Sequence, residues 1–202
     1  LVEKLAQVAT SLANDVISSI DVEVRGEIST HDVSVLSTSA LKGALIAMGA
    51  EDVTYVNAPA LAESRSLTSA VSTDAESPDH RNLVSVRAAC ADGSQVFVSG
   101  TLMGIKQIQK IVAIDKLDLD LKPTNNLLFL RYTDQPGVVG VVGNALGKLK
   151  INIADMQVGR TQEGGQALMA LTVDSLIPNE IIDVIAKETG ASLVRFVNLV
   201  NE

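Results

Sequence analysis

Apolar and polar positions near the start of the chain change period, which predicts a helix, a strand and a second helix. Residues 1–20 place apolar side chains three and four positions apart, the spacing of an amphipathic helix. Residues 22–28 alternate instead, with charged side chains between the apolar ones, as expected for a half-exposed strand. Helical spacing returns over residues 32–48 and stops at Gly49, a residue type that commonly ends helices.

The segment that follows, up to residue 122, has mostly the pattern of short strands. A strand is expected at residues 53–57, and then a helix opened by Pro59, because proline loses no hydrogen bond in a first helical turn. The pair Asp92-Gly93 predicts a hairpin, since these residues tolerate the positive φ of a tight turn. The remaining apolar or alternating runs lie at residues 67–73, 84–88, 95–100, 108–114 and 117–121.

The rest of the chain has a more regular pattern, and the polar residues 122–126, with Pro123, form a linker before it. The expected elements alternate as strand 127–132, helix 137–149, strand 151–159, strand 166–174, helix 179–189 and strand 192–199. This β-α-β-β-α-β order is typical of the ferredoxin-like arrangement. The sequence therefore predicts an α+β protein with two domains, residues 1–122 and 123–202.

The amino-acid composition excludes several classes of partner and of structural site. The net charge is −8 and aromatic residues make up 2% of the chain, so we expect no nucleic-acid partner. No apolar run reaches the roughly 20 residues that cross a bilayer, and no membrane role is expected. The single cysteine, Cys90, excludes an internal disulfide framework and fits a cytoplasmic protein with a buried thiol. The chain begins at Leu1 within a helical pattern, so we expect it to be part of a longer protein.

Candidates for catalysis or metal binding are few. His31 and His80 lie in polar stretches away from any plausible nucleophile, and surface or capping roles are expected for both. Asp115, Asp118 and Asp120 could suggest a calcium loop, but the glycine such a loop needs is absent and leucines alternate with the carboxylates. A solvated strand face is therefore the favoured interpretation, and we expect neither a catalytic residue nor a metal site.

The glycines of residues 137–147 resemble a dinucleotide-binding loop, because they follow a strand and open a helix. The close G-x-G pair that admits a pyrophosphate is missing, however. The favoured alternative is that Gly140, Gly143 and Gly147 share one helix face and allow that face to pack against a sheet. No cofactor is therefore expected in this chain.

The strand-to-helix corner before these glycines is a better candidate for binding. The free N–H groups of residues 137–139 make a natural seat for a carboxylate at a helix N-terminus. Asp134 could balance an ammonium, and Asn152 can donate as well as accept a hydrogen bond. Together these groups would suit an α-amino acid. The alternative from the residues alone is that Asp134 only caps the helix.

Residues 127–199, with "RYTDQPGVVGVVGNALGKLKINIADMQVGR" near their start, resemble an ACT domain, a regulatory module that commonly binds amino acids. The D-x-P-G corner, followed by the Asn of "INIA", carries this resemblance. The strings "VTYVNAPALAESR", "ESPDHRNLVSVRA", "ADGSQVFVSGTLMG" and "QKIVAID" resemble the allosteric substrate-binding (ASB) domain of long-form D-3-phosphoglycerate dehydrogenases. The resemblance spans essentially the whole chain and implies the C-terminal regulatory region of such an enzyme.

In the parent enzyme, the resemblance implies NAD-dependent oxidation of 3-phosphoglycerate to 3-phosphohydroxypyruvate, the first step of L-serine biosynthesis. It implies L-serine as feedback effector between paired ACT domains, and a homo-oligomer, a dimer or tetramer, that forms through ACT and ASB contacts. The expected effector residues are Tyr132, Asp134, Val138, Val139 and Asn152. A phosphate or phosphorylated substrate is expected in the ASB domain at Lys110, Lys122, Arg65, Thr101 and Gly104. The alternative is the small regulatory subunit of an iron–sulfur L-serine dehydratase, which has a similar layout.

Overall fold

The computed structural model describes residues 1–199 and confirms the α+β class. The chain divides into two compact units between Asp115 and Lys116. This division lies earlier than the domain boundary predicted at residue 122, and it places the short strand β6 (Leu117–Leu121) in the second unit.

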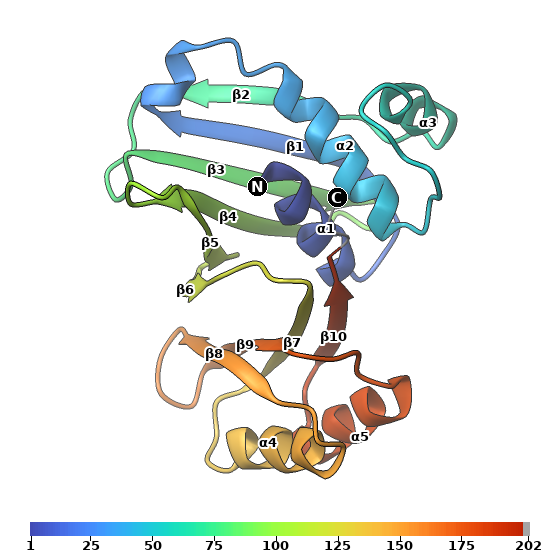
Figure 1. Ribbon diagram of the computed structural model, residues 1–202, viewed down its shortest axis with the longest axis vertical. Coiled ribbons are helices and arrows are strands. Elements are labelled where there is room, and N and C mark those ends of the chain that lie inside the picture. The colour runs from blue at the N-terminus through green and yellow to red at the C-terminus, as the bar shows by residue number, and fades with distance from the viewer. Residues whose placement is uncertain (200–202) are drawn as a thin grey trace. The chain divides into compact units, whose positions relative to one another are not determined.

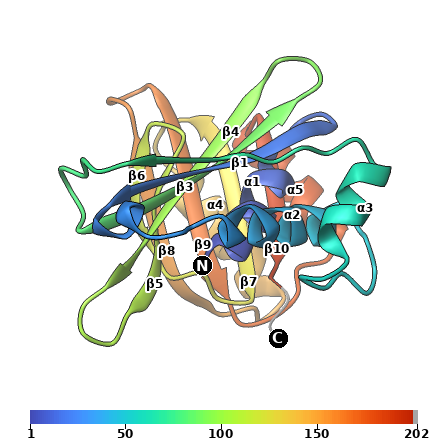
Figure 2. The same cartoon turned by 90° about the horizontal axis from the view of Figure 1, so that it is seen from above.

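The first unit is a mixed sheet with helices on one face. Its strands are β1 (Ile17–Gly26), β2 (Val71–Asp74), β3 (Asn82–Cys90), β4 (Gln95–Met103) and β5 (Ile108–Ile114), in the order β2-β1-β3-β4-β5. Only β1 and β2 run parallel among these neighbours. Helices α1 (Val2–Leu12) and α2 (Val35–Ala47) pack together on the sheet, and α3 (Ala58–Ser64) contacts α2 (Figures 1 and 2). A short 3₁₀ helix, η1 (Glu27–Thr30), follows β1.

The helix predicted over residues 1–20 is too long, because α1 ends at Leu12. Ala13 is extended, with φ −66° and ψ 142°, and the Val16 N–H donates to the Asp15 carboxylate at 2.7 Å. The side chains of Asn14 and Asp15 compete locally with helical hydrogen bonds, as these residue types often do. Ile17 therefore starts β1, although its neighbours continue the helical spacing of apolar residues.

The strand predicted at residues 53–57 is wrong, since this segment is a turn that leads into α3. The Thr54 N–H donates to the Asn57 side chain at 2.7 Å, and the Asn57 N–H donates to the Thr54 hydroxyl at 3.2 Å. These reciprocal bonds satisfy the backbone locally, without a neighbouring strand. Val56, within the segment expected to be a strand, is 91% exposed.

Strand β1 shows why the sheet forms here. Ile20, Val22 and Val24 are almost fully buried on the side of the helices, while the residues between them face the opposite side. This alternation removes one apolar row from water and leaves the other face polar, as in a sheet covered on one side.

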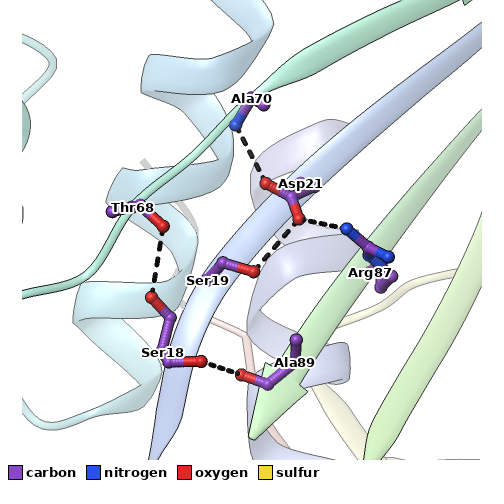
Figure 3. A network of polar contacts seen from close by, with 7 residues as sticks. All are labelled: Ser18, Ser19, Asp21, Thr68, Ala70, Arg87 and Ala89. Atoms are coloured by element: carbon purple, nitrogen blue, oxygen red, sulfur yellow. Dashed lines mark hydrogen bonds and ion pairs between the residues drawn. The ribbon is translucent and has the colours of Figure 1, made fainter.

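A hydrogen-bond network around Asp21 ties three segments together on that polar face (Figure 3). One carboxylate oxygen, Oδ2, accepts from the Arg87 guanidinium of β3 at 2.7 Å and from the Ser19 hydroxyl at 3.0 Å. The other oxygen accepts from the Ala70 N–H, just before β2, at 3.0 Å. Asp21 therefore links β1 to both of its neighbours in the sheet.

The second unit has the predicted β-α-β-β-α-β order of a ferredoxin-like domain, preceded by β6. Its elements are β7 (Asn126–Thr133), α4 (Val138–Lys148), β8 (Ile153–Arg160), β9 (Gln166–Val173), α5 (Asn179–Thr189) and β10 (Leu193–Asn198). The strands form an antiparallel sheet in the order β10-β7-β9-β8. Buried residues of α4 and α5, such as Leu146 and Ile185, pack on one face of it. Strand β6 packs against β8, where a Cβ at Gly159 would lie 2.8 Å from the Asp118 carbonyl oxygen.

The prediction that the glycines of α4 pack against the sheet is wrong. A Cβ added at Gly140, Gly143 or Gly147 meets no atom within 4 Å. The helix instead turns Val142 and Leu146 inward, and both are fully buried. The helix thus has a face of glycines and a face with Val142 and Leu146. The second face lies inside because its burial removes more apolar surface from water.

The network around Asp21 generates a stability prediction. Asp21→Ala removes the acceptor of three hydrogen bonds, one from a charged group, and should lower the free energy of unfolding by about 2 kcal/mol. Urea unfolding followed by circular dichroism measures the change. Glu27→Ala is the matched control, because it breaks the Arg81–Glu27 pair, whose side chains are 80% and 64% exposed. That control should change the free energy little, and an equal loss in both variants would contradict the role given to Asp21.

Candidate functional site

The corner between β7 and α4, residues 133–137, presents unpaired backbone donors. Gly137 precedes the helix with φ +95°, a left-handed conformation that suits glycine. The first helical hydrogen bond runs from the Val141 N–H to the Gly137 carbonyl at 3.0 Å. The N–H groups of residues 137–140 therefore have no acceptor inside the helix, and they provide a site of positive potential.

Asp134 is held at this corner by two contacts. Its N–H donates to the Gly165 carbonyl at 2.8 Å, and its carboxylate accepts from the Arg160 guanidinium at 3.0 Å. The N-terminus of α4 has no side-chain capping bond, so Asp134 does not cap the helix. The carboxylate is available at the corner instead, with its side chain 19% exposed.

Asn152 lies just before β8 and is exposed. Its side-chain N–H donates to the Asp174 carboxylate at 2.9 Å, and its backbone carbonyl accepts from the backbone N–H of Asp174 at 3.2 Å. These bonds fix the amide beside the end of β9.

The structure does not bring Asn152 to the corner within one chain. Strand β9 pairs its first residue, Gln166, with Thr133 at the corner, and its last residue, Val173, with Ile153 next to Asn152. The two groups therefore lie at opposite ends of β9. At about 3.3 Å per residue, the length of this strand separates them by roughly 20 Å or more.

The other predicted effector residues are mostly buried. Tyr132 is 3% exposed and belongs to the core of the second unit, as does Val138. Burial, and secondarily the charge of Asp134, raise the pKa of the Tyr132 hydroxyl above its usual value. Val139, in contrast, is 50% exposed on the first turn of α4. These three residues support the corner, and only Val139 presents its side chain to solvent.

Three of the predicted anion-binding residues lie at one end of the first-unit sheet. Thr101 and Lys110 are paired across β4 and β5, and Gly104 lies in the turn that joins these strands. The Thr101 hydroxyl is buried and donates to the Asn82 carbonyl at 2.5 Å. Because that proton is used, Thr101 can only accept a further hydrogen bond, whereas an anion needs donors.

The other two predicted anion-binding residues lie elsewhere. Arg65 lies at the end of α3, and Thr68 follows it closely. Thr68 forms a β-bridge with Ser19 of β1, and Ser19 pairs with Ala89 near the end of β3. Thr101 lies instead beside the first residue of β3, so Arg65 is at the opposite end of the sheet. Lys122 is exposed and belongs to the second unit.

No group of three or more histidine, cysteine or acidic residues that could hold a metal ion occurs within residues 1–199. Across the same residues, no helix is long and apolar enough to cross a membrane. Asp115, one of the carboxylates considered for a calcium loop, accepts a hydrogen bond from the Phe97 N–H at 2.9 Å, so it serves the turn after β5. Cys90 is a buried free thiol.

Comparison with known proteins gives the two units family names. The sequence model of the D-3-phosphoglycerate dehydrogenase intervening domain matches residues 1–115, and that of the ACT domain matches residues 126–190. The chain belongs to the D-3-phosphoglycerate dehydrogenase intervening-domain family. Its second unit is an ACT domain.

Curated relatives named D-3-phosphoglycerate dehydrogenase match almost the whole chain. D-3-phosphoglycerate dehydrogenase of Mycobacterium leprae is 39% identical over 199 residues, and that of Mycobacterium bovis is 41% identical. Each match covers 98% of this chain and 38% of the relative. The enzyme of a Synechocystis strain is 32% identical over 94% of this chain and 34% of its own. The chain therefore spans little more than a third of the length of these relatives.

The ACT-domain corner contains one charged residue that sequence reasoning missed. Arg160 is the last residue of β8, far from Asp134 in sequence, and the pairing of β9 with both β8 and β7 brings them together. Its one sequence signal is its place at the end of a predicted strand, immediately before a polar turn.

The glycine at the start of α4 should be required, and the glycine one turn later should not. Gly137→Ala places a Cβ on a backbone with φ +95° and should lower the free energy of unfolding by about 1–2 kcal/mol. Gly140→Ala is the control, because its Cβ meets open space in a helix and should raise that free energy by about 0.5–1 kcal/mol. Urea unfolding measures both, and effects of the same sign would contradict this account of the corner.

The raised pKa of Tyr132 predicts a loss of stability at high pH. The unfolded chain ionises its tyrosines near their usual pKa of about 10, whereas the folded chain resists losing this proton. The free energy of unfolding should therefore keep this contribution below about pH 10 and lose it as the pH rises through the folded-state pKa. Tyr132→Phe should flatten that decline in urea unfolding at alkaline pH. Parallel declines in the variant and the wild type would contradict the assignment.

Proposed function

We propose that the chain is the regulatory region of a D-3-phosphoglycerate dehydrogenase and binds L-serine as feedback effector between two ACT domains. The parent enzyme would oxidise 3-phosphoglycerate to 3-phosphohydroxypyruvate with NAD, in residues of the relatives that lie outside the matched part. The glycines of α4 do not fit NAD, because Gly140, Gly143 and Gly147 lie within the helix and not in a loop before it. This chain would regulate the reaction without taking part in it.

The corner has the groups that an α-amino acid needs. Its carboxylate would accept from the N–H groups of residues 137–139, where the helix dipole favours a negative charge. Its ammonium would donate to Asp134, whose carboxylate has one oxygen without a hydrogen-bond partner among residues 1–199. An amide side chain such as that of Asn152 could then bind the remaining polar groups.

The position of β8 at a sheet edge is the observation that carries the proposal. Among the described residues, the sheet order gives β8 a hydrogen-bonded neighbour on one side only, β9. If β8 pairs with β8 of a second copy about a two-fold axis, the strands run antiparallel. The end of β8 at Arg160, next to Asp134, then lies beside the start of the partner's β8, next to the partner's Asn152. Two equal sites would form, each with groups from both copies.

A shared site of this kind supports regulation. A ligand changes a conformational equilibrium only when it binds one arrangement better than another. L-serine bound between two copies would favour the paired arrangement, because the unpaired chain keeps Asp134 and Asn152 at opposite ends of β9. The names of the relatives support the dehydrogenase over the L-serine dehydratase alternative.

The anion site of the first unit stays a prediction. Lys110 lies on β5 at this end of the sheet, with Gly104 close by, which supports a contribution from its ammonium. The Thr101 hydroxyl, which already donates to Asn82, argues against a direct role of its side chain. The place of Arg65 at the other end of the sheet argues against its taking part.

Isothermal titration calorimetry with L-serine tests the effector site. The wild-type chain should bind, and Asn152→Ala should weaken binding at least about tenfold, since it removes a hydrogen-bonding amide from each site. Lys122→Ala is the control and should bind like the wild type. Absence of binding by the wild-type chain, with the paired state verified by light scattering, would contradict the proposal.

A mixture of variants tests whether two copies share the site. Asp134→Asn and Asn152→Ala should each bind weakly alone. A mixed pair of the two combines an intact Asp134 with the partner's intact Asn152 at one of its two sites, and about half of the pairs in an equimolar mixture should be mixed. Recovery of strong binding at a fraction of the sites is expected after exchange of subunits. No recovery, despite exchange shown by native mass spectrometry, would contradict a shared site.

A further inference from the structure

Arg160 and Asp134 form an ion pair beside the unpaired N–H groups of α4. The Arg160 Nη1 lies 3.0 Å from the Asp134 Oδ2, and the side chains are 56% and 19% exposed. The pair joins the end of β8 to the corner after β7, across the start of β9. It is therefore positioned by the sheet itself and by the bond between the Asp134 N–H and the Gly165 carbonyl.

The pair leaves most of its hydrogen-bonding capacity unused. A guanidinium has five N–H donors, and within residues 1–199 one of those of Arg160 is used. The second carboxylate oxygen of Asp134 accepts no hydrogen bond from residues 1–199. Unused donors and an unused acceptor thus lie next to each other at one exposed place, and a ligand can bind to both without breaking the pair.

We propose that Arg160 is a specificity-determining residue of the effector site. Together with the N–H groups of residues 137–139, it binds the carboxylate of an α-amino acid whose ammonium binds Asp134. This inference rests on the proposed function. The four charges would alternate around a ring, from Asp134 to Arg160, to the ligand carboxylate, to the ligand ammonium and back to Asp134. The ammonium and the carboxylate of an α-amino acid are attached to the same carbon atom, and this close spacing matches that of the pair.

This arrangement selects the zwitterion. An amine without a carboxylate would share the single negative charge of Asp134 with the guanidinium, and the second negative charge that separates the two cations in the ring would be missing. A carboxylate without an ammonium would meet the charge of Asp134. Only a ligand that carries both groups satisfies both members of the pair, so discrimination comes from the penalty on each incomplete ligand as much as from the contacts.

Arginine suits this role better than lysine. Its planar fork can donate to Asp134 with one N–H and to a ligand carboxylate with the others, and its charge is only weakly hydrated. A lysine ammonium is a compact point charge and lacks the fixed fork geometry. Arg160→Lys should therefore keep the charge and lose part of the discrimination.

Calorimetric titration of the full chain with L-serine and with ethanolamine, which lacks the carboxylate, tests the inference. The wild type should bind L-serine more tightly than ethanolamine. Arg160→Gln should weaken L-serine about 10- to 100-fold, the value of a charged hydrogen-bonded contact, and leave ethanolamine unchanged or slightly tighter. The L-serine affinity of Arg160→Lys should lie between those of the wild type and Arg160→Gln. Arg81→Gln is the matched control, because it removes an exposed arginine from an ion pair in the first unit and should change neither affinity.

The outcomes separate the inference from the proposed function. L-serine affinity unchanged in Arg160→Gln, with wild-type binding intact, would overturn the role of Arg160 and leave the effector site standing. Equal losses for L-serine and ethanolamine would also overturn it, because they indicate that Arg160 only holds Asp134 in place. Absence of L-serine binding by the wild type would overturn both.

Discussion

The pairing of β9 with β7 on one side and β8 on the other determines where every candidate effector group lies. It brings Arg160 to Asp134 although they are distant in sequence, and it holds Asn152 at the far end of the sheet. A strand of this length cannot bend to unite its ends, because its backbone hydrogen bonds run along both sides. In the proposed arrangement, one chain would present two half-sites, and a complete site would require a second copy at the edge strand.

The charges at the corner are compatible with the proposed binding of a small zwitterion, although the chain has a net charge of −8. Asp134 alone would repel a carboxylate, but Arg160 balances its charge at 3.0 Å, and the N-terminus of α4 adds positive potential. The two charges of the pair cancel, so the N-terminus of α4 remains as the positive element of the corner. In an exposed pair the bond itself contributes little to stability, so the geometry of this pair fits a role in recognition better than a role in folding.

The sequence predicted the second unit well because its apolar periods are long and its turns contain glycine and proline. The prediction failed where local polar side chains ended a helix early, as at Asn14 and Asp15. It also failed for α4, where the glycine face was expected to be buried and the face with Val142 and Leu146 is buried instead. Asp134 and Asn152 were predicted as effector residues from the corner and from the family resemblance, and their separation within one chain followed only from strand register. Arg160 had no periodic signal, since an exposed arginine at a strand end is common on any sheet.

Division of the proposed site between copies has a thermodynamic consequence for regulation. A ligand that binds equally to paired and unpaired chains shifts nothing, however tight it is. The paired state gains RT ln(1 + [L]/Kd) from each complete site, and two-fold symmetry supplies two such sites, so the gain is doubled. In the proposed site, the unpaired chain would offer the ligand Asp134, Arg160 and the N–H groups of residues 137–139, without the partner's amide. The difference between the affinities of the paired and unpaired states would limit the control that L-serine exerts on the assembly.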